Sequence, residues 1–270
     1  VGDILYVVKS RQSWWYYDFS QDTEDNASVV SIDVSNPEKP NIVEELSFPG
    51  NANEIHVTQN ALFVTQNFYE QGQTSSNQTG STSHDGGDAN TADETEPSSA
   101  DEQPITEPAE PDMWVSGQEQ SKIQYIDISD PAGKLKKRGS ITVAGYPKGR
   151  FHIDAFQNYF RIVTQKWEQG SNSILNIIDT TNPDTLTLTS SIGDIGKGED
   201  LRATRFDGER AYVVTFEQID PLWIIDLSDP KNPEIAGELE VPGWSDFIEP
   251  RGNSLIAVGH EQVNDEFKVT

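Results

Sequence analysis

The sequence predicts an all-β fold built from repeated four-stranded antiparallel units, and three observations lead to this prediction. First, one hexapeptide pattern occurs four times, as IDVSNP, IDISDP, IDTTNP and IDLSDP. Second, the motif aspartates Asp33, Asp127, Asp179 and Asp226 are spaced by 94, 52 and 47 residues, and the first interval becomes 52 without a 42-residue insertion. Third, the intervening runs are rich in β-branched and aromatic residues and lack helical apolar spacing. A repeat of about 40–50 residues with four strands is typical of a β-propeller blade.

The repeat also predicts where each blade lies. The clearest repeat reads AYVVTF, LWIIDLS and EIAGELEV, three strands joined by EQIDP and by the turn DPKNP. The predicted blades cover about 1–50, 53–143, 149–192 and 200–243, and a further blade starts over 246–270. Propellers close with whole blades, but three strands are expected in the first repeat and two in the last. The chain has no initiating Met, so we expect a fragment of roughly four blades from a longer protein.

The motif aspartates are expected to have a structural role. An Asp side chain accepts hydrogen bonds from nearby backbone N–H groups, and the following Pro cannot donate to a sheet. The calcium-loop spacing D-x-[DN]-x-[DN]-G-x5-E is absent from every repeat, although an acidic cluster at 18–25 offers oxygen atoms. We therefore expect turns rather than calcium loops, and neither a metal nor a cofactor.

The insertion Gln71–Asp112 interrupts the second repeat between its second and third strands. It contains ten acidic residues and no Lys or Arg, and it is dominated by Ser, Thr, Gly and Pro. Such a composition leaves little apolar surface to bury, so a disordered acidic segment is expected.

The stretch ERAYVVTFEQIDPLWIIDLSDPKNPEIAGELEVPGWSDFIEP resembles a β-propeller family of secreted bacterial and archaeal proteins, distantly related to WD repeats. The resemblance is closest over residues 199–260 and extends more weakly over the rest, apart from the insertion. This family is largely uncharacterised. The resemblance implies the propeller fold and a location outside the cell or on its envelope, and it implies no catalytic residues.

Composition excludes several classes of function. The net charge is −26, with a sequence pI near 4.3, and such a surface repels the phosphate backbone of nucleic acids. The chain has no cysteine, which excludes disulfides and Cys-based metal sites. No apolar run approaches the ~20 residues of a membrane-spanning helix.

Seven polar residues are expected on the first strands of the blades, which line the central channel of a propeller. They are Glu54, His56, Arg150, His152, Asp154, Asp200 and Arg202. They suggest two alternatives, a polar axial site or a channel wall held by cross-strand charge pairs. With an active site at the channel mouth, the chain would be a secreted hydrolase, but the sequence favours a protein that is not an enzyme, because no G-x-S-x-G motif occurs.

Aromatic residues predict a binding surface at one end of the blades. In antiparallel blades, the hairpins between second and third strands share an end with the connections between blades. That end receives the longest loops, including RQSWWYYDFSQDTEDNA and the insertion. Binding residues are concentrated on such loops. The predicted ligand-binding residues are Trp14, Trp15, Tyr16, Tyr17, Tyr146, Trp167 and Trp244. The leading hypothesis is a non-catalytic binding or scaffold propeller that recognises a protein or a glycan.

Overall fold

A computed structural model describes most of the chain outside the two longest loops. It covers residues 2–10, 27–70, 118–167, 170–216, 220–241, 244–252, 254–263 and 266–269. Residues 14–17 and the insertion 71–112 lie outside these ranges, so what the sequence predicts for them stays a prediction.

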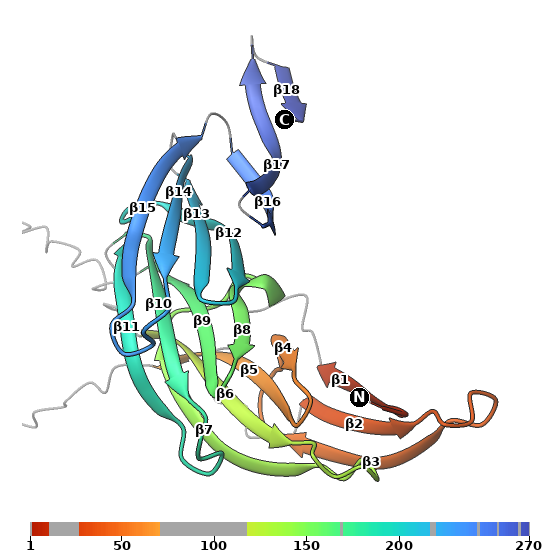
Figure 1. The fold of residues 1–270 in the computed structure, drawn as a ribbon. Helices are drawn as coiled ribbons and strands as arrows, with labels where there is room; N and C mark the ends of the chain where they lie inside the picture. The colour runs from red at the N-terminus through yellow and green to blue at the C-terminus, as the bar shows by residue number, and fades with distance from the viewer. Residues whose placement is uncertain are drawn as a thin grey trace, which may run out of the picture. The chain divides into compact units, whose positions relative to one another are not determined.

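Five antiparallel sheets make up the described chain, and each is one blade (Figure 1). Blade 1 contains β1 (Ile4–Ser10), β2 (Ala27–Asp33) and β3 (Asn41–Phe48). Blade 2 contains β4 (Glu54–Val57), β5 (Ala61–Glu70), β6 (Gln118–Asp127) and β7 (Lys136–Ala144). Blade 3 contains β8 (Ile153–Phe156), β9 (Tyr159–Lys166), β10 (Asn172–Asp179) and β11 (Thr187–Ile195). Blade 4 contains β12 (Asp200–Asp207), β13 (Arg210–Phe216), β14 (Asp220–Asp226) and β15 (Glu234–Val241). Blade 5 contains β16 (Trp244–Arg251), β17 (Ser254–Val263) and β18 (Glu266–Val269).

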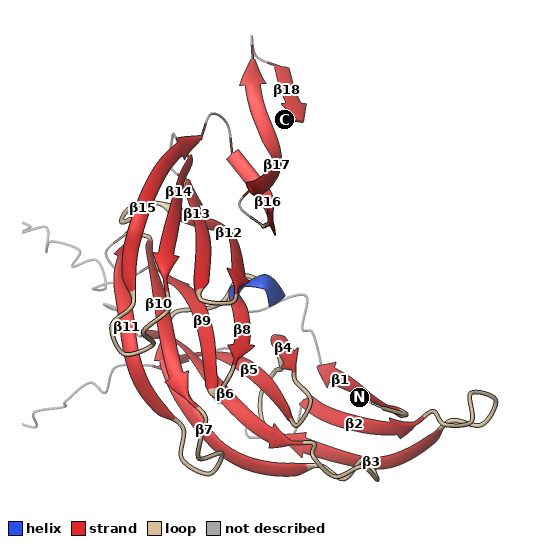
Figure 2. Cartoon of the chain, viewed as in Figure 1, coloured by secondary structure: helices blue, strands red, loops and turns tan. Residues whose placement is uncertain are grey.

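The predicted all-β class with four-stranded antiparallel blades is confirmed. Figure 2 shows strands throughout, apart from the short 3₁₀ helix η1 (Arg150–His152) before β8. One detail differs from the prediction. Blade 5 has a third strand, β18, which pairs with β17 over Glu266–Val269.

Four hydrophobic clusters fill the spaces between consecutive blades. The second strands of blades 2 to 4 contribute to two clusters each, because their alternate side chains point to opposite faces. In β5, Leu62 and Val64 pack toward blade 1, whereas Phe63 packs toward blade 3. The rings of Phe63 and Phe160 lie 4.5 Å apart across this interface. Burial on both faces explains why these strands read as continuous apolar runs instead of alternating ones. Each fully buried side chain contributes about 1.5–3 kcal/mol.

A β-bulge recurs between the third and fourth strands of blades 1 to 4. The residue eleven positions after the motif aspartate lies close to each bulge. In blades 1 to 3 this residue is Glu44, Arg138 or Ser190, and its side chain bonds to the turn between the third and fourth strands of the next blade. Glu44 Oε2 accepts the Leu135 N–H at 2.7 Å, and Ser190 Oγ donates to the Pro230 carbonyl at 2.6 Å. In blades 1 to 3 the bulge thus turns one side chain of the outer strand toward the next blade, which links the blades beyond their apolar cores.

The link between blades 2 and 3 is the strongest of this series. Arg138 donates two hydrogen bonds to Asp184, at 2.6 and 2.7 Å, and a third to Asp127 at 2.8 Å. Gly139 beside it donates its N–H to the Pro183 carbonyl at 2.8 Å. A Cβ atom at Gly139 would lie 2.7 Å from the Asp184 backbone, so only glycine allows this approach.

Candidate functional site

The repeated turns between third and fourth strands are alike in all four complete motifs. The carboxylate of each motif aspartate accepts the N–H two residues later, Asp33 from Ser35 at 2.8 Å, Asp127 from Ser129 at 3.0 Å, Asp179 from Thr181 at 2.7 Å and Asp226 from Ser228 at 2.8 Å. A second such bond follows in each turn, accepted by Asn36, Asp130, Asn182 and Asp229. The predicted hydrogen bonds, which the aspartates accept from backbone N–H groups, are therefore confirmed.

These hydrogen bonds also hold the motif carboxylates in their charged form. The bonds from the residue two positions later lower the pKa of Asp33, Asp127, Asp179 and Asp226 below its usual value. Each carboxylate is thus engaged with its own turn. Within the described residues, no three or more His, Asp or Glu side chains are grouped to hold a metal ion.

At the opposite end of the blades, the structure brings two predicted aromatic residues close to the base of the insertion hairpin. Gly145, with φ of +77°, turns the chain after β7 and donates its N–H to the Glu119 carbonyl at 2.7 Å. Tyr146 then pairs with the Gln165 backbone, and its hydroxyl donates to the Phe68 carbonyl at 2.9 Å. The connection after blade 2 is therefore held against two hairpins, the insertion hairpin after β5 and the hairpin between β9 and β10.

Trp167 stands on the second of these hairpins, and it is 43% exposed. Its backbone N–H donates to Glu119 Oε2 at 2.9 Å, and the Lys148 ammonium lies 5.2 Å from its ring centroid. We define Phe68, Tyr146, Lys148 and Trp167 as the hairpin patch. Aromatic area and a cation lie together there on anchored loops. Trp244 begins β16, but its side chain lies outside the described part of the structure.

Among the predicted channel residues, Asp154 takes part in a cross-strand charge pair. It is the register partner of Arg161, whose Nε donates to Asp154 at 2.9 Å. The guanidinium lies between the rings of Phe156 and Phe206, 5.0 and 4.8 Å from their centroids. Arg161 is 4% exposed, and the Asp154 side chain beside it is half-buried. This pair favours the charge-paired wall over a free catalytic carboxylate at this position.

Asp200 is likewise bound by its neighbours. It accepts hydrogen bonds from Ser171 Oγ at 2.9 Å and from Gln165 Nε2 at 3.1 Å. Burial acts to raise the pKa of Asp200, but the Ser171 bond, Lys148, Gln165 and Arg202 outweigh it, so the pKa is lowered. Asp200 therefore stays ionised near neutral pH.

His152 has a buried position rather than an exposed one on a channel wall. Its ring is 5% exposed, and Nδ1 lies 2.7 Å from the Thr204 hydroxyl of β12. Burial, with smaller effects of Lys148 and Arg205, lowers the pKa of His152 to about 4. The ring is thus neutral at pH 7 and links blade 3 to blade 4.

Glu54 and His56 lie on β4 and are half-buried. Burial raises the pKa of Glu54, although the charge of Arg150 opposes the shift. Burial also lowers the pKa of His56, with Asp154 opposing and Arg161 assisting. Both side chains are therefore shifted toward their neutral forms.

Sequence reasoning missed a group of side chains at the first strands, Phe151, Arg205, Phe247 and Glu249. The Arg205 guanidinium lies 3.5 Å from the ring centroid of Phe151 and 4.7 Å from that of Phe247. Its Nε is 3.6 Å from Glu249. An alignment of the first strands with one another would have pointed to this group. Asp154, Arg205 and Glu249 occupy the same position of the repeat, because each pairs with the equivalent residue of the second strand.

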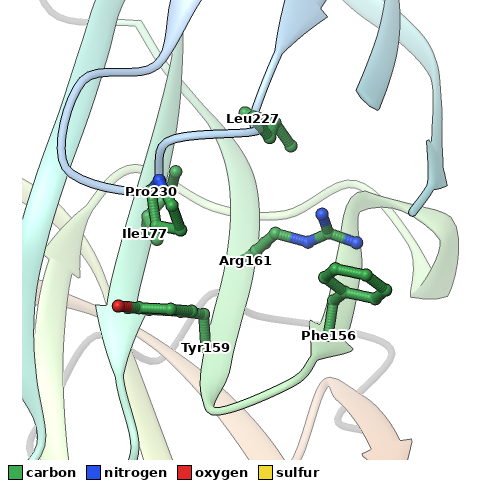
Figure 3. A pocket seen from close by; sticks show the side chains of 6 residues that line it. All are labelled: Phe156, Tyr159, Arg161, Ile177, Leu227 and Pro230. Atoms are coloured by element: carbon green, nitrogen blue, oxygen red, sulfur yellow. The ribbon is translucent and has the colours of Figure 1, made fainter. Parts of the chain in front are cut away.

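One small hollow lies between blade 3 and the turn of blade 4 (Figure 3). Its lining residues are Phe156, Tyr159, Arg161, Ile177, Leu227 and Pro230. The hollow has room for little more than a water molecule, far below the ~300 Å³ of small-molecule sites. Its charged group, Arg161, is already paired with Asp154. This hollow is therefore a packing feature.

Proteins similar to this chain are uncharacterised or of unknown function. An uncharacterized protein of Archaeoglobus fulgidus is 32% identical over 145 residues, which are 53% of this chain and 22% of that protein. Another uncharacterized protein, from Methanocaldococcus jannaschii, is 35% identical over 124 residues, 44% of this chain and 19% of its own length. The match thus spans about a fifth of each of these curated relatives. A crystal structure of a functionally unknown Desulfotomaculum acetoxidans protein aligns with a TM-score of 0.34 and 12% identity, over 81% of this chain and 65% of that one.

No helix in the described ranges has the length and apolar character of a membrane span.

The family assignment follows from the sequence match and agrees with the blades. The model of the beta propeller domain family matches residues 114–269, more than half of the chain. The chain belongs to the beta propeller domain family.

Proposed function

We propose that this chain is a non-catalytic binding or scaffold module that recognises a protein or a glycan at the hairpin end of its blades. The observation that carries the proposal is the hairpin patch, where Trp167 is 43% exposed beside the cation of Lys148. Exposed aromatic groups of this kind supply contact area at binding surfaces. The bond that the Trp167 N–H donates to Glu119 and the backbone bridge between Tyr146 and Gln165 fix the loops, which lowers the entropy lost on binding.

The places of the two longest loops in the strand order support ligand binding at the same end of the blades. The segment 11–26, with Trp14 and Trp15, joins β1 to β2, and the insertion 71–112 joins β5 to β6. Both segments connect a second strand to a third, as the Trp167 loop does between β9 and β10. We further propose a location outside the cell or on its envelope, which rests on the resemblance noted from the sequence.

The rival function, a secreted hydrolase, has one residue in its favour. Glu54 combines a half-buried position with a raised pKa, which a general acid requires. A glycosidase also needs a second free carboxylate. Asp154 on β8 and Glu249 on β16 are instead ion-paired with Arg161 and Arg205. We therefore rank binding above hydrolysis.

A glycan array and a protein array, run beside a panel of chromogenic glycosides and esters, test the proposal. We expect retained binding without turnover. The double variant Trp14→Ala/Trp15→Ala should weaken binding at least tenfold, about 1.4 kcal/mol. Leu239→Ala is the matched control, because Leu239 is an apolar side chain 58% exposed on the outer strand β15. Turnover that disappears in Glu54→Gln, without retained binding, would instead establish the hydrolase.

A further inference from the structure

Four cations lie on the first strand β12 and on the segment before β8, and only one of them, Lys148, belongs to the hairpin patch. They are Lys148, Arg150, Arg202 and Arg205. These residues lie on the connection after β7, on η1 and on β12. In the described chain, β12 lies beside both η1 and β16. Four cations thus gather on adjoining elements of a protein whose net charge is −26.

Aromatic rings lie among these cations. Arg205 stacks on Phe151 and Phe247, and Arg150 lies 4.6 Å from the Phe151 ring centroid. The two rings meet edge to face, with centroids 6.4 Å apart. Phe151 is 42% exposed and Phe247 is 40% exposed. This first-strand patch therefore offers apolar surface and positive charge together.

The cations have more hydrogen-bonding capacity than their neighbours use. Arg205 lies near Glu249, but Lys148, Arg150 and Arg202 have no acid within ion-pair distance among the described residues. The nearby carboxylates are largely engaged, since Asp154 binds Arg161 and Asp200 binds Ser171 and Gln165. Donors are left over at this surface.

The cations also repel one another. Burial lowers the pKa of Lys148, and the charge of Arg202 adds to the effect, while Asp200 opposes it. Burial lowers the pKa of Arg205 against the opposing Glu249, and Arg150 lowers it further. A bound anion would relieve this repulsion.

We propose that the first-strand patch binds an acidic peptide that carries apolar side chains next to its carboxylates. Arg150, Arg202 and Lys148 would receive the carboxylates, and Phe151 and Phe247 would receive the apolar side chains. Lysine and arginine only donate hydrogen bonds, so they match acceptor-only carboxylates better than sugar hydroxyls, which also need acceptors. The bare phenyl rings likewise suit apolar side chains. This site goes beyond the proposed binding at the hairpin patch, because Lys148 is the one residue that the two patches share.

Fluorescence anisotropy of the whole chain with a fluorescein-labelled peptide of alternating Glu and Leu tests this site. The chain should bind this peptide and should not bind one of alternating Lys and Leu. Added salt should weaken the complex, because it screens exposed charges. Arg150→Ala/Arg202→Ala should weaken binding at least tenfold. Arg150→Gln/Arg202→Gln, which keeps longer polar side chains, should do the same without a change in melting temperature.

A second pair of cations provides the matched control. Lys39 and Lys134 are exposed and lie elsewhere, so Lys39→Ala/Lys134→Ala makes the same change in net charge. This control should retain wild-type affinity. The proposal is overturned if the wild type does not bind the acidic peptide, or if the control loses as much affinity as the Arg150/Arg202 variants. Displacement of the peptide by an oligogalacturonate that binds more tightly would overturn the assignment to peptides.

Discussion

The two ends of the blades differ in how far they repeat. At the turn end, four aspartates make the same hydrogen bond to the residue two positions later, and three outer strands bond to the next turn. At the hairpin end, the loops differ in length and composition, and they carry Tyr146 and Trp167. A contact that recurs from blade to blade stabilises the structure that the blades have in common. Function is better sought where they differ.

The two ends also depend on different chemistry. The turns are held by ionised carboxylates, whereas the connection before blade 3 is held by the neutral, buried His152. The ends should therefore respond differently to acid. This difference gives the largest of the expected effects.

Acidification should destabilise the two ends in separate pH ranges. Because the folded state holds the pKa of His152 near 4, the unfolded chain takes up this proton first as the pH falls below about 6.5. Stability should decline by roughly 3 kcal/mol between pH 6.5 and 4. The motif carboxylates, with lowered pKa values, contribute stability above their unfolded pKa and lose it only below about pH 4.

Denaturant unfolding of the wild type and of His152→Gln across this pH range checks this prediction. The variant should lose most of the slope between pH 6.5 and 4 and keep the decline at lower pH. A smaller slope should remain, because burial also lowers the pKa of His56. An unchanged slope in His152→Gln would show that this histidine does not carry the effect.

Gly139→Ala should break one link at the turn end. The new Cβ atom would lie 2.7 Å from the Asp184 backbone, so β7 and the turn of blade 3 must move apart. Overpacking of this kind costs about 1–3 kcal/mol. Gly237→Ala is the control, since this glycine of β15 has no atom within 4 Å of an added Cβ. Equal melting temperatures for the two variants would refute the close contact.

Asp127→Ala should cost a smaller amount at the same end. It removes the hydrogen bonds to Ser129 and the ion pair with Arg138, which are partly exposed, so we expect a loss of about 1 kcal/mol. A chelator such as EGTA should leave the melting temperature of the wild type unchanged. A large fall after chelation would mean that the motif aspartates bind calcium after all.

Removal of the insertion should have the smallest effect. Joining Gln71 to Asp112 through a short Gly-Ser linker should shift the thermal midpoint by only a few degrees, because loop-closure entropy changes logarithmically with length. Differential scanning calorimetry of the two chains measures the shift. Loss of the cooperative transition would show that the segment supports the fold.

The sequence was sufficient for the blades but not for the site. The recurring Asp-Pro motif and the apolar second strands fixed the repeat, because turn chemistry and double-sided burial leave direct patterns in the chain. The motif also predicted the bonds of Asp127 and Asp226. The stacking of Arg205 between Phe151 and Phe247 was not predictable in the same way. It joins three elements, and it depends on how neighbouring first strands align. The burial of His152 beside Thr204 likewise depends on packing between blades.

The most direct test of the division between the two ends measures affinity and stability together. For a ligand found on the arrays, calorimetric titration and thermal melting should be compared between Trp167→Ala and Asp127→Ala. We expect Trp167→Ala to weaken binding at least tenfold and to change stability by less than about 0.5 kcal/mol, as for other exposed positions. Asp127→Ala should lower the melting temperature and leave the affinity unchanged. The opposite pattern, with binding lost in Asp127→Ala and retained in Trp167→Ala, would place the ligand at the turn end and contradict the account.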